Sequence, residues 1–157
     1  MGKNNIYRYY KMVDKVKKAK DLKFGDGAER DVLDILKALN PNTTKIKDKY
    51  YVMDYSITDD DGKLIEELEV KSRRIKHNQY PTLVFGKNKY NHSLKQLANG
   101  IKQTYLFNCR DGLYKWELTD PVIQKNEFYE GTICNYARND KPHSAIHIYT
   151  QNLVRVW

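Results

Sequence analysis

Apolar residues recur every three or four positions in three segments of the chain, which is the spacing of an amphipathic helix. The pattern predicts helices over residues 5–20, 28–39 and 92–101. Gly25-Asp26-Gly27 precedes the second helix and Asn40-Pro41 follows it, and such residues interrupt helices. The side chains expected to face the core are Ala28, Val32, Ile35, Leu36 and Leu39 in the second helix and Leu94, Leu97, Ala98 and Ile101 in the third.

Segments rich in β-branched, aromatic and aliphatic residues, bounded by turn residues, predict the strands. Two of them, over residues 50–57 and 64–74, flank Asp61-Gly62, which is a strong hairpin signal. The register that follows pairs Asp54 with Glu69, Ser56 with Glu67 and Thr58 with Ile65. Further strands are predicted over residues 82–85, 104–109, 113–118, 128–136 and 145–149, with 153–157 returning to the sheet and a polar turn over 86–89.

The hairpin register places two carboxylates side by side. Opposed side chains on antiparallel strands lie about 5 Å apart on one face, so Asp54 and Glu69 are expected to be neighbours. Lys71 points to the same face as Glu69, because side chains alternate along a strand, whereas Leu68 and Val70 point to the other. Adjacent carboxylates repel each other, and a divalent cation such as Mg²⁺ or Mn²⁺ between them removes that cost. The alternative is an ordinary hairpin with a charged outer face.

These residues carry a resemblance to a known family. Asp54, then Glu69-x-Lys71 on the next strand, preceded by a helix with Glu29, resemble the PD-(D/E)XK nuclease superfamily, although Met53 stands where the motif often has proline. The segments Gly25-Asp26-Gly27-Ala28-Glu29-Arg30-Asp31 and Glu69-Val70-Lys71-Ser72-Arg73-Arg74 are similar to archaeal-type Holliday junction resolvases. The similarity covers roughly residues 24–74, about a third of the chain.

The resemblance implies an α/β fold, an α+β mixed sheet with flanking helices around a restriction-endonuclease-like core. It implies one nuclease domain over residues 1–157, with a basic helix at 1–24, a catalytic core at 25–118 and C-terminal strands at 119–157. The implied activity is Mg²⁺-dependent DNA cleavage, with Mn²⁺ as a substitute. The favoured interpretation is a structure-selective, junction-resolving enzyme, and the second is a restriction-type or mobile-element nuclease. A non-catalytic DNA-binding module on the same fold and an RNA-directed nuclease stay open.

The resemblance also implies a role for each site residue. Asp54, Glu69 and the main-chain carbonyl of Val70 would hold the metal, and Lys71 would lie near the attacking water. Glu29 would ligate a second ion or orient water, although Asp26-x-x-Glu29 also fits a helix-capping box. Cutting two strands would take a homodimer.

Composition and charge favour a polyanionic partner. The net charge is +8, and the first 24 residues hold eight basic against two acidic residues, a surplus of six. A basic helix contacting phosphates and a solvated helix face both explain this surplus. The expected DNA contacts are Lys11, Lys15, Lys18, Arg73, Arg74, Lys76, Lys87 and Lys89.

The cysteines and histidines lack the sequence spacing of a metal site or a redox motif. Cys109 and Cys134 indicate a reduced, cytoplasmic protein rather than a disulfide, and no apolar run reaches the length of a membrane span. His77 and His92 lack the spacing of a zinc site or a catalytic triad, so we expect both at the surface. No small-molecule cofactor is expected.

Overall fold

A computed structural model of the chain describes residues 26–133 and 141–157, and the side chains from residue 31 onward. The elements, in chain order, are α2 (Asp26–Leu39), β1 (Thr43–Lys45), β2 (Tyr55–Thr58), β3 (Leu64–Ser72), β4 (Thr82–Gly86), α3 (Lys87–Ala98), β5 (Lys102–Cys109), β6 (Gly112–Leu118), β7 (Phe128–Ile133), β8 (His143–Tyr149), the short 3₁₀ helix η2 (Thr150–Asn152) and β9 (Val154–Arg155). The predicted helix over residues 5–20, with Lys11, Lys15 and Lys18, lies outside the described residues.

The strands form two sheets, and the class is mixed α+β as expected. The first sheet has six strands in the order β1-β2-β3-β5-β6-β9, and the second has three in the order β4-β8-β7. Within the first sheet β3 and β5 are parallel, while the remaining neighbours are antiparallel. A parallel pair needs a long crossover connection, and β4 with α3 supplies it.

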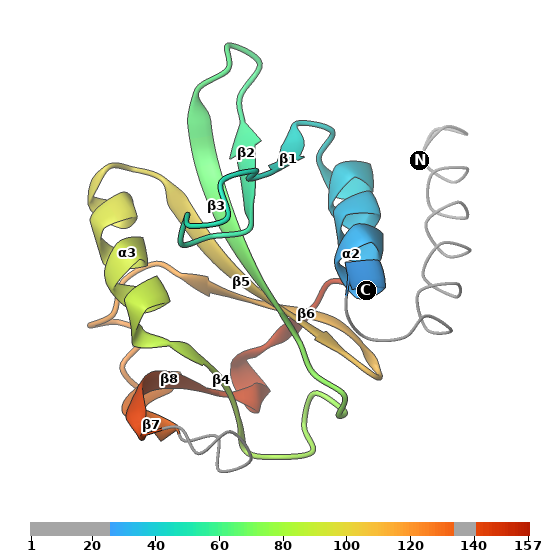
Figure 1. Cartoon of the computed structure of the whole chain (residues 1–157). Helices are drawn as coiled ribbons and strands as arrows, with labels where there is room; N and C mark the ends of the chain where they lie inside the picture. The colour runs from blue at the N-terminus through green and yellow to red at the C-terminus, as the bar shows by residue number, and fades with distance from the viewer. Residues whose placement is uncertain (1–25, 134–140) are drawn as a thin grey trace.

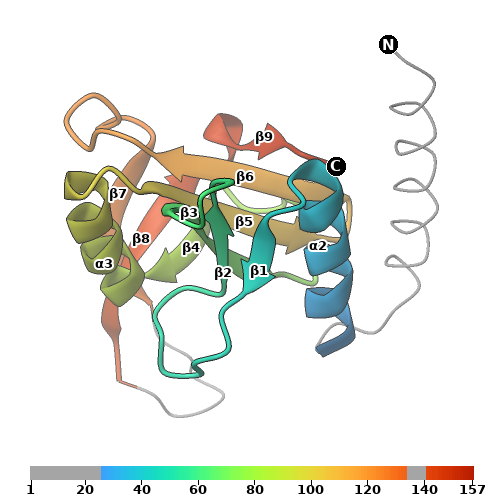
Figure 2. The same cartoon turned by 90° about the horizontal axis from the view of Figure 1, so that it is seen from above.

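The first sheet lies between α2 on one face and α3 with the second sheet on the other (Figures 1 and 2). Val32, Ile35 and Leu36 of α2 pack against the β3 side chains Leu68 and Val70 in one core cluster. The other cluster joins aromatic residues of β5 and β6 to the inner side chains of β4 and β8, with the partly buried Leu97 of α3 packed against it. The predicted inward stripe of α2 is thus confirmed at its three central positions. The prediction was wrong for Leu39, which is 52% exposed at the end of the helix, and the Ala28 side chain lies outside the described residues.

The hairpin register is confirmed over most of its length. Tyr55 pairs with Leu68 and Ser56 pairs with Glu67, as predicted, but a register shift after Ile57 places Thr58 opposite Leu64 rather than Ile65. The tip is wider than the two predicted residues: the Asp59 amide donates to the Lys63 carbonyl at 2.8 Å, and Gly62 takes a positive φ of 83°. Five residues, 59–63, separate Thr58 from Leu64, and this odd number accompanies the one-residue shift of the register.

Two element predictions were wrong, and one short strand was not predicted. Strand β2 begins at Tyr55 rather than at residue 50, because the Tyr50 and Tyr51 amides bond to Asp48 in a turn at 2.9 and 3.1 Å. The three-residue strand β1 was not predicted. Helix α3 begins at Lys87, where we expected a turn, because the chain passes directly from β4 into the helix. Its N-cap residue, Gly86, has no side chain to mark the start.

The remaining strands agree closely with the predicted segments. The second hairpin appears as β5 and β6, and residues 145–149 form most of β8. The C-terminal segment returns to the first sheet, where β9 pairs with β6. Strand β7 follows the prediction through Ile133, and residues 134–136 lie outside the described residues.

Candidate metal and nucleic-acid site on strand β3

One face of β3 carries a row of charged side chains. Glu67 and Glu69 each retain only 1% of their accessible surface, which is unusual for carboxylates. The Lys71 ammonium lies 2.7 Å from Oε1 of Glu69, so Glu69 and Lys71 share a face. Leu68 and Val70 face α2 on the other side. The alternation predicted for Glu69-Val70-Lys71 is therefore confirmed.

Asp54 lies against the main chain of β3 beside this row. Its amide donates to the Leu68 carbonyl at 3.0 Å, and its carboxylate oxygen Oδ2 accepts from the Val70 amide at 2.9 Å. Asp54 and Glu69 are close enough that the Asp54 charge helps to raise the pKa of Glu69, after the larger effect of burial. The structure brings Asp54, Glu69 and Lys71 together, while their roles stay predictions.

Two lysines neutralise Glu69. Besides Lys71, the ammonium of Lys89 on α3 lies 3.1 Å from Oε1 and 3.2 Å from Oε2 of Glu69, and it also donates to the Val52 carbonyl. The Lys89 side chain is only 17% exposed. Burial raises the pKa of Glu69, and Lys71 and Lys89 oppose that rise. Lys89, predicted as a phosphate contact, is instead turned inward onto the predicted metal ligand.

Glu29 lies in α2, and its side chain is outside the described residues. Its helix packs against the Leu68 and Val70 face of β3, opposite to the face that carries Glu69. Its role in orienting water or holding a second ion stays a prediction.

A second buried carboxylate, Glu67, is held by four hydrogen-bond donors that the sequence reasoning missed. His92 Nε2 and Gln96 Nε2 of α3 each lie 2.9 Å from its Oε1, Gln103 Nε2 lies at 3.1 Å, and the Tyr51 hydroxyl bonds to Oε2. Burial alone would raise the pKa of Glu67, but these hydrogen bonds outweigh it and lower the pKa. The result is an ionised carboxylate fixed between β3 and α3.

The prediction of which α3 residues face inward was therefore wrong in part. Leu94 and Ala98 are exposed, and Ser93 is the residue of α3 that is fully buried. A signal existed in the sequence: Lys89, His92 and Gln96 are spaced three and four residues apart, so they form one polar stripe. Polar stripes usually face solvent, but this one meets the carboxylates of β3.

The remaining basic residues near β3 divide into two groups. Arg73 is half-buried, and its guanidinium donates to the Ser72 carbonyl at 3.1 Å and to the Val84 carbonyl of β4 at 3.0 Å. Lys87 is paired with Glu130 of β7. Arg74 and Lys76 are exposed. Among the described residues of the predicted set, these last two are the ones whose side chains are exposed.

His77 and His92, expected at the surface, are partly buried, with side chains that are 26% and 18% exposed. In the loop after β3, Asp111 fixes His77: its Oδ2 lies 2.5 Å from Nδ1, and its Oδ1 accepts from the His77 amide at 2.9 Å. The His77 ring stacks on Tyr114 with 4.0 Å between the ring centroids. Cys109, near this pair, is buried, and burial followed by the Asp111 charge raises its thiol pKa to about 12. It is an unreactive core residue.

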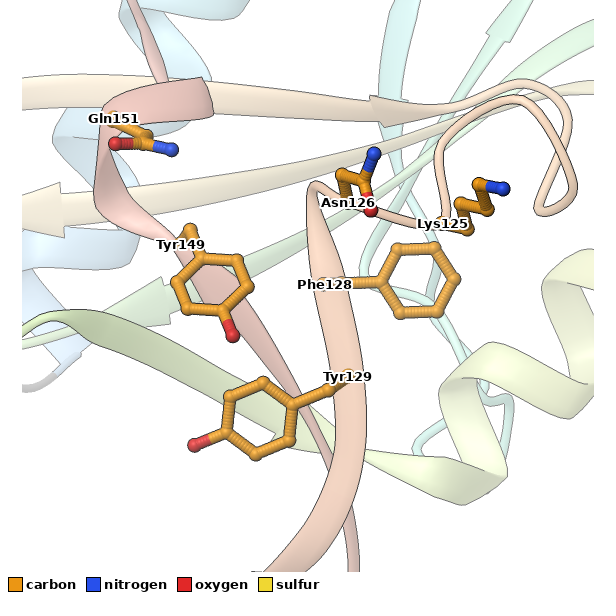
Figure 3. Close-up of a pocket in the computed structure, with 6 residues that line it drawn as sticks. All are labelled: Lys125, Asn126, Phe128, Tyr129, Tyr149 and Gln151. Atoms are coloured by element: carbon orange, nitrogen blue, oxygen red, sulfur yellow. The ribbon is translucent and has the colours of Figure 1, made fainter.

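A separate hollow of about 350 Å³ opens on the second sheet, at one end of β7 and β8 (Figure 3). The rings of Tyr129 and Tyr149 lie on one side of β7, and the Phe128 ring lies on the other (Figure 3). None of the residues that line the hollow contacts Glu67 or Glu69 through a described bond. The hollow is therefore not part of the candidate site on β3.

Comparison of the chain with protein-family models, curated proteins and solved structures gives no match. Within residues 26–133 and 141–157, no group of three or more histidine, cysteine, aspartate or glutamate side chains is arranged to hold a metal. No helix in that part of the chain is long and apolar enough to cross a membrane. The candidate site thus stands on its own geometry: two carboxylates and two lysines around the middle of β3.

Proposed function

We propose that the protein is a Mg²⁺-dependent DNA endonuclease, built on a restriction-endonuclease-like core of the PD-(D/E)XK type. The observation that supports this most is the buried Glu69 carboxylate, which has Asp54 beside it and Lys71 at 2.7 Å on the same face. Burying a carboxylate costs free energy, and its pKa is raised accordingly. Perturbed ionisable groups that converge in this way are typical of functional sites.

The donor set fits a divalent cation. Asp54 and Glu69 offer carboxylate oxygens, which Mg²⁺ and Mn²⁺ prefer. The Val70 amide faces Asp54, and the amide and carbonyl of one residue in an antiparallel strand face the same neighbour, so we expect the Val70 carbonyl on that side too. A bound Mg²⁺ would polarise the scissile phosphate and lower the pKa of a water molecule.

The side chains of the protein would position and stabilise the reacting groups. Lys71, whose side chain is 28% exposed, is reachable from solvent and would hold the attacking water and stabilise the negative charge that develops on the phosphate. The hydrogen bond from the Val70 amide fixes the Asp54 carboxylate. Arg74 and Lys76 would contact neighbouring phosphates. Hydrolysis of both strands would take a homodimer.

The test compares two DNA shapes. Purified protein with Mg²⁺ is incubated with a four-way junction and with a linear duplex of matched sequence. We expect the junction to be cut faster. Cleavage at equal rates, or sequence-dependent cleavage of the duplex, would favour the restriction-type or mobile-element alternative.

A non-catalytic DNA-binding module is the second candidate, and one observation favours it. Glu69 is already neutralised by Lys71 and Lys89, so the arrangement is stable without a metal. Lys71→Ala separates the two functions, because an enzyme should lose cleavage and keep DNA binding, whereas a binding module has no cleavage to lose. Lys63→Ala, at the exposed hairpin tip, is the matched control and should cleave normally.

A further inference from the structure

The ammonium of Lys89 lies in a cage of three oxygens. Both carboxylate oxygens of Glu69 lie within 3.2 Å of it, and the Val52 carbonyl completes the set. A lysine ammonium has three N–H donors. Two of them form hydrogen bonds, to Oε2 of Glu69 and to the Val52 carbonyl, and Oε1 of Glu69 lies within ion-pair distance. Carboxylate and carbonyl oxygens are also the ligands that a hard divalent cation takes. The cage therefore suits either cation, but not both at once.

We propose, on the basis of the proposed metal site, that Lys89 serves as the counter-ion of Glu69 in the metal-free protein. Its ammonium group occupies the position of the divalent cation and moves away when that cation binds. Val52 then becomes a further carbonyl ligand beside Asp54 and Glu69. Lys89 can leave because it lies in the first turn of α3, where a long flexible side chain reaches solvent without moving the helix.

The charge balance favours exchange over coexistence. Asp54, Glu69, Lys71 and Lys89 sum to zero when all are ionised. A divalent cation that enters with Lys89 still in place leaves the site at +2, whereas exchange leaves it at +1. A phosphodiester carries one negative charge, so the exchanged site is neutral once the substrate is bound. In a site where Glu69 is only 1% exposed, uncompensated charge is costly.

The same helix offers a matched control. Lys87 lies two residues before Lys89 in the same turn and pairs with Glu130 of β7, which is exposed. Substituting either lysine by methionine removes one positive charge and preserves the length of the side chain. Only the substitution of Lys89 removes a competitor from Glu69.

The experiment measures Mn²⁺ binding to the full-length protein without DNA, by electron paramagnetic resonance of the free ion. We expect Lys89→Met to bind Mn²⁺ about tenfold more tightly than the wild type, the equivalent of one removed charge contact. Lys87→Met should bind within about twofold of the wild type. Equal or weaker binding by Lys89→Met would overturn the proposal and would make Lys89 a supporting residue of the site.

A second variant guards against misfolding. Lys89→Arg keeps the charge and pairs with a carboxylate through two parallel N–H bonds, so it should bind Mn²⁺ more weakly than the wild type. Tighter binding by this variant would also overturn the proposal. If Mn²⁺ binding follows the expected order but no DNA is cut, the endonuclease function fails and the exchange stands. If neither the wild type nor Lys89→Met binds Mn²⁺, the metal site fails and the exchange fails with it.

Discussion

At the scale of single residues, Glu67 shows how one carboxylate can join two elements. It is buried on β3 and accepts hydrogen bonds from α3, from β5 and from Tyr51. Such a network replaces the water that the carboxylate loses, and each hydrogen bond to a charged group contributes about 1.5 to 3 kcal/mol. The position of α3, and of Lys89 on it, therefore depends on the charge of Glu67.

Replacing Glu67 by Gln should lower the free energy of unfolding at pH 7 by roughly 2 to 3 kcal/mol, because a neutral amide faces four donors. Urea unfolding measures this loss. Glu66→Gln is the matched control: its carboxylate is on the opposite face, accepts from the Thr104 hydroxyl at 2.8 Å and is less buried, so the loss should stay below about 1 kcal/mol. Equal losses in the two variants would contradict the importance of the Glu67 network.

The lowered pKa of Asp111 leads us to expect that the free energy of unfolding depends on pH. Burial alone would raise its pKa, but hydrogen bonds from the ring and amide of His77 outweigh that effect and lower the pKa below its usual 3.8. A carboxylate whose pKa is lowered on folding adds stability above its unfolded pKa, and that stability is lost as the pH falls through the folded pKa.

Asp111→Asn should therefore be less stable than the wild type by about 1 kcal/mol at pH 7, and the difference should shrink as the pH falls below about 4. Thermal unfolding across this pH range measures both quantities. Asp61→Asn, at the exposed hairpin tip, should match the wild type throughout. A difference between Asp111→Asn and the wild type that stays constant with pH would show that packing rather than charge is responsible.

The sequence was enough to predict one half of the candidate site. Asp54, Glu69 and Lys71 follow from a local register and from side-chain alternation, both fixed within twenty residues of chain. Lys89 and His92 depend on how α3 meets β3, a contact between distant segments. Their inward orientation runs against the usual rule that charged residues of a helix face solvent, so the sequence pattern misplaced them.

At the scale of elements, glycine fixes the return of the C-terminal strand. Gly112 begins β6 with a φ of +150°, and a Cβ on it would lie 2.5 Å from the Trp157 carbonyl oxygen. That carbonyl accepts from the Leu113 amide at 3.0 Å, which closes the pairing of the C-terminal segment with β6. No larger residue fits this approach without a shift of the backbone.

Gly112→Ala should lower the free energy of unfolding by about 2 to 3 kcal/mol, because it combines backbone strain with a clash against the main chain. Gly100→Ala is the control: its φ is also positive, at 77°, but the added Cβ has open space around it, so only about 1 kcal/mol should be lost. Hydrogen exchange at residues 153–157 should quicken in the first variant alone. Unchanged exchange there would contradict the proposed contact.

Elements with local signals were predictable, and those without them were not. The Asp-Gly turn predicted the pairing of Ser56 with Glu67, although the register shifts beyond Ile57. The start of α3 was missed because Gly86 carries no capping side chain and the first turn of the helix has no acidic residue. Strand β1, with three residues, is too short to show an alternating pattern.

At the scale of the whole molecule, the sequence predicted the mixed α+β class but not the division into two sheets. The inner residues of β4 and β8 face the first sheet, and this packing depends on contacts that no local pattern encodes. The second sheet connects to the end of β3 through Arg73, which bonds to the Val84 carbonyl of β4. A residue predicted as a DNA contact thus has a structural contact as well.

The positive charge of the molecule and the position of Arg73 lead to a final prediction about DNA affinity. Each lysine or arginine that neutralises a phosphate adds about one unit to the slope of log Kd against log salt. Lys76 is exposed in the loop after β3, so Lys76→Ala should weaken binding and reduce that slope by about one. Arg73→Ala should leave the slope unchanged and lower the free energy of unfolding instead. The substitution removes two hydrogen bonds, to the Ser72 carbonyl at the end of β3 and to the Val84 carbonyl of β4.

Fluorescence anisotropy with a labelled duplex in EDTA, from about 50 to 200 mM NaCl, measures the slope without cleavage. Equal reductions in both variants would mean that Arg73 turns outward to the phosphates when DNA binds.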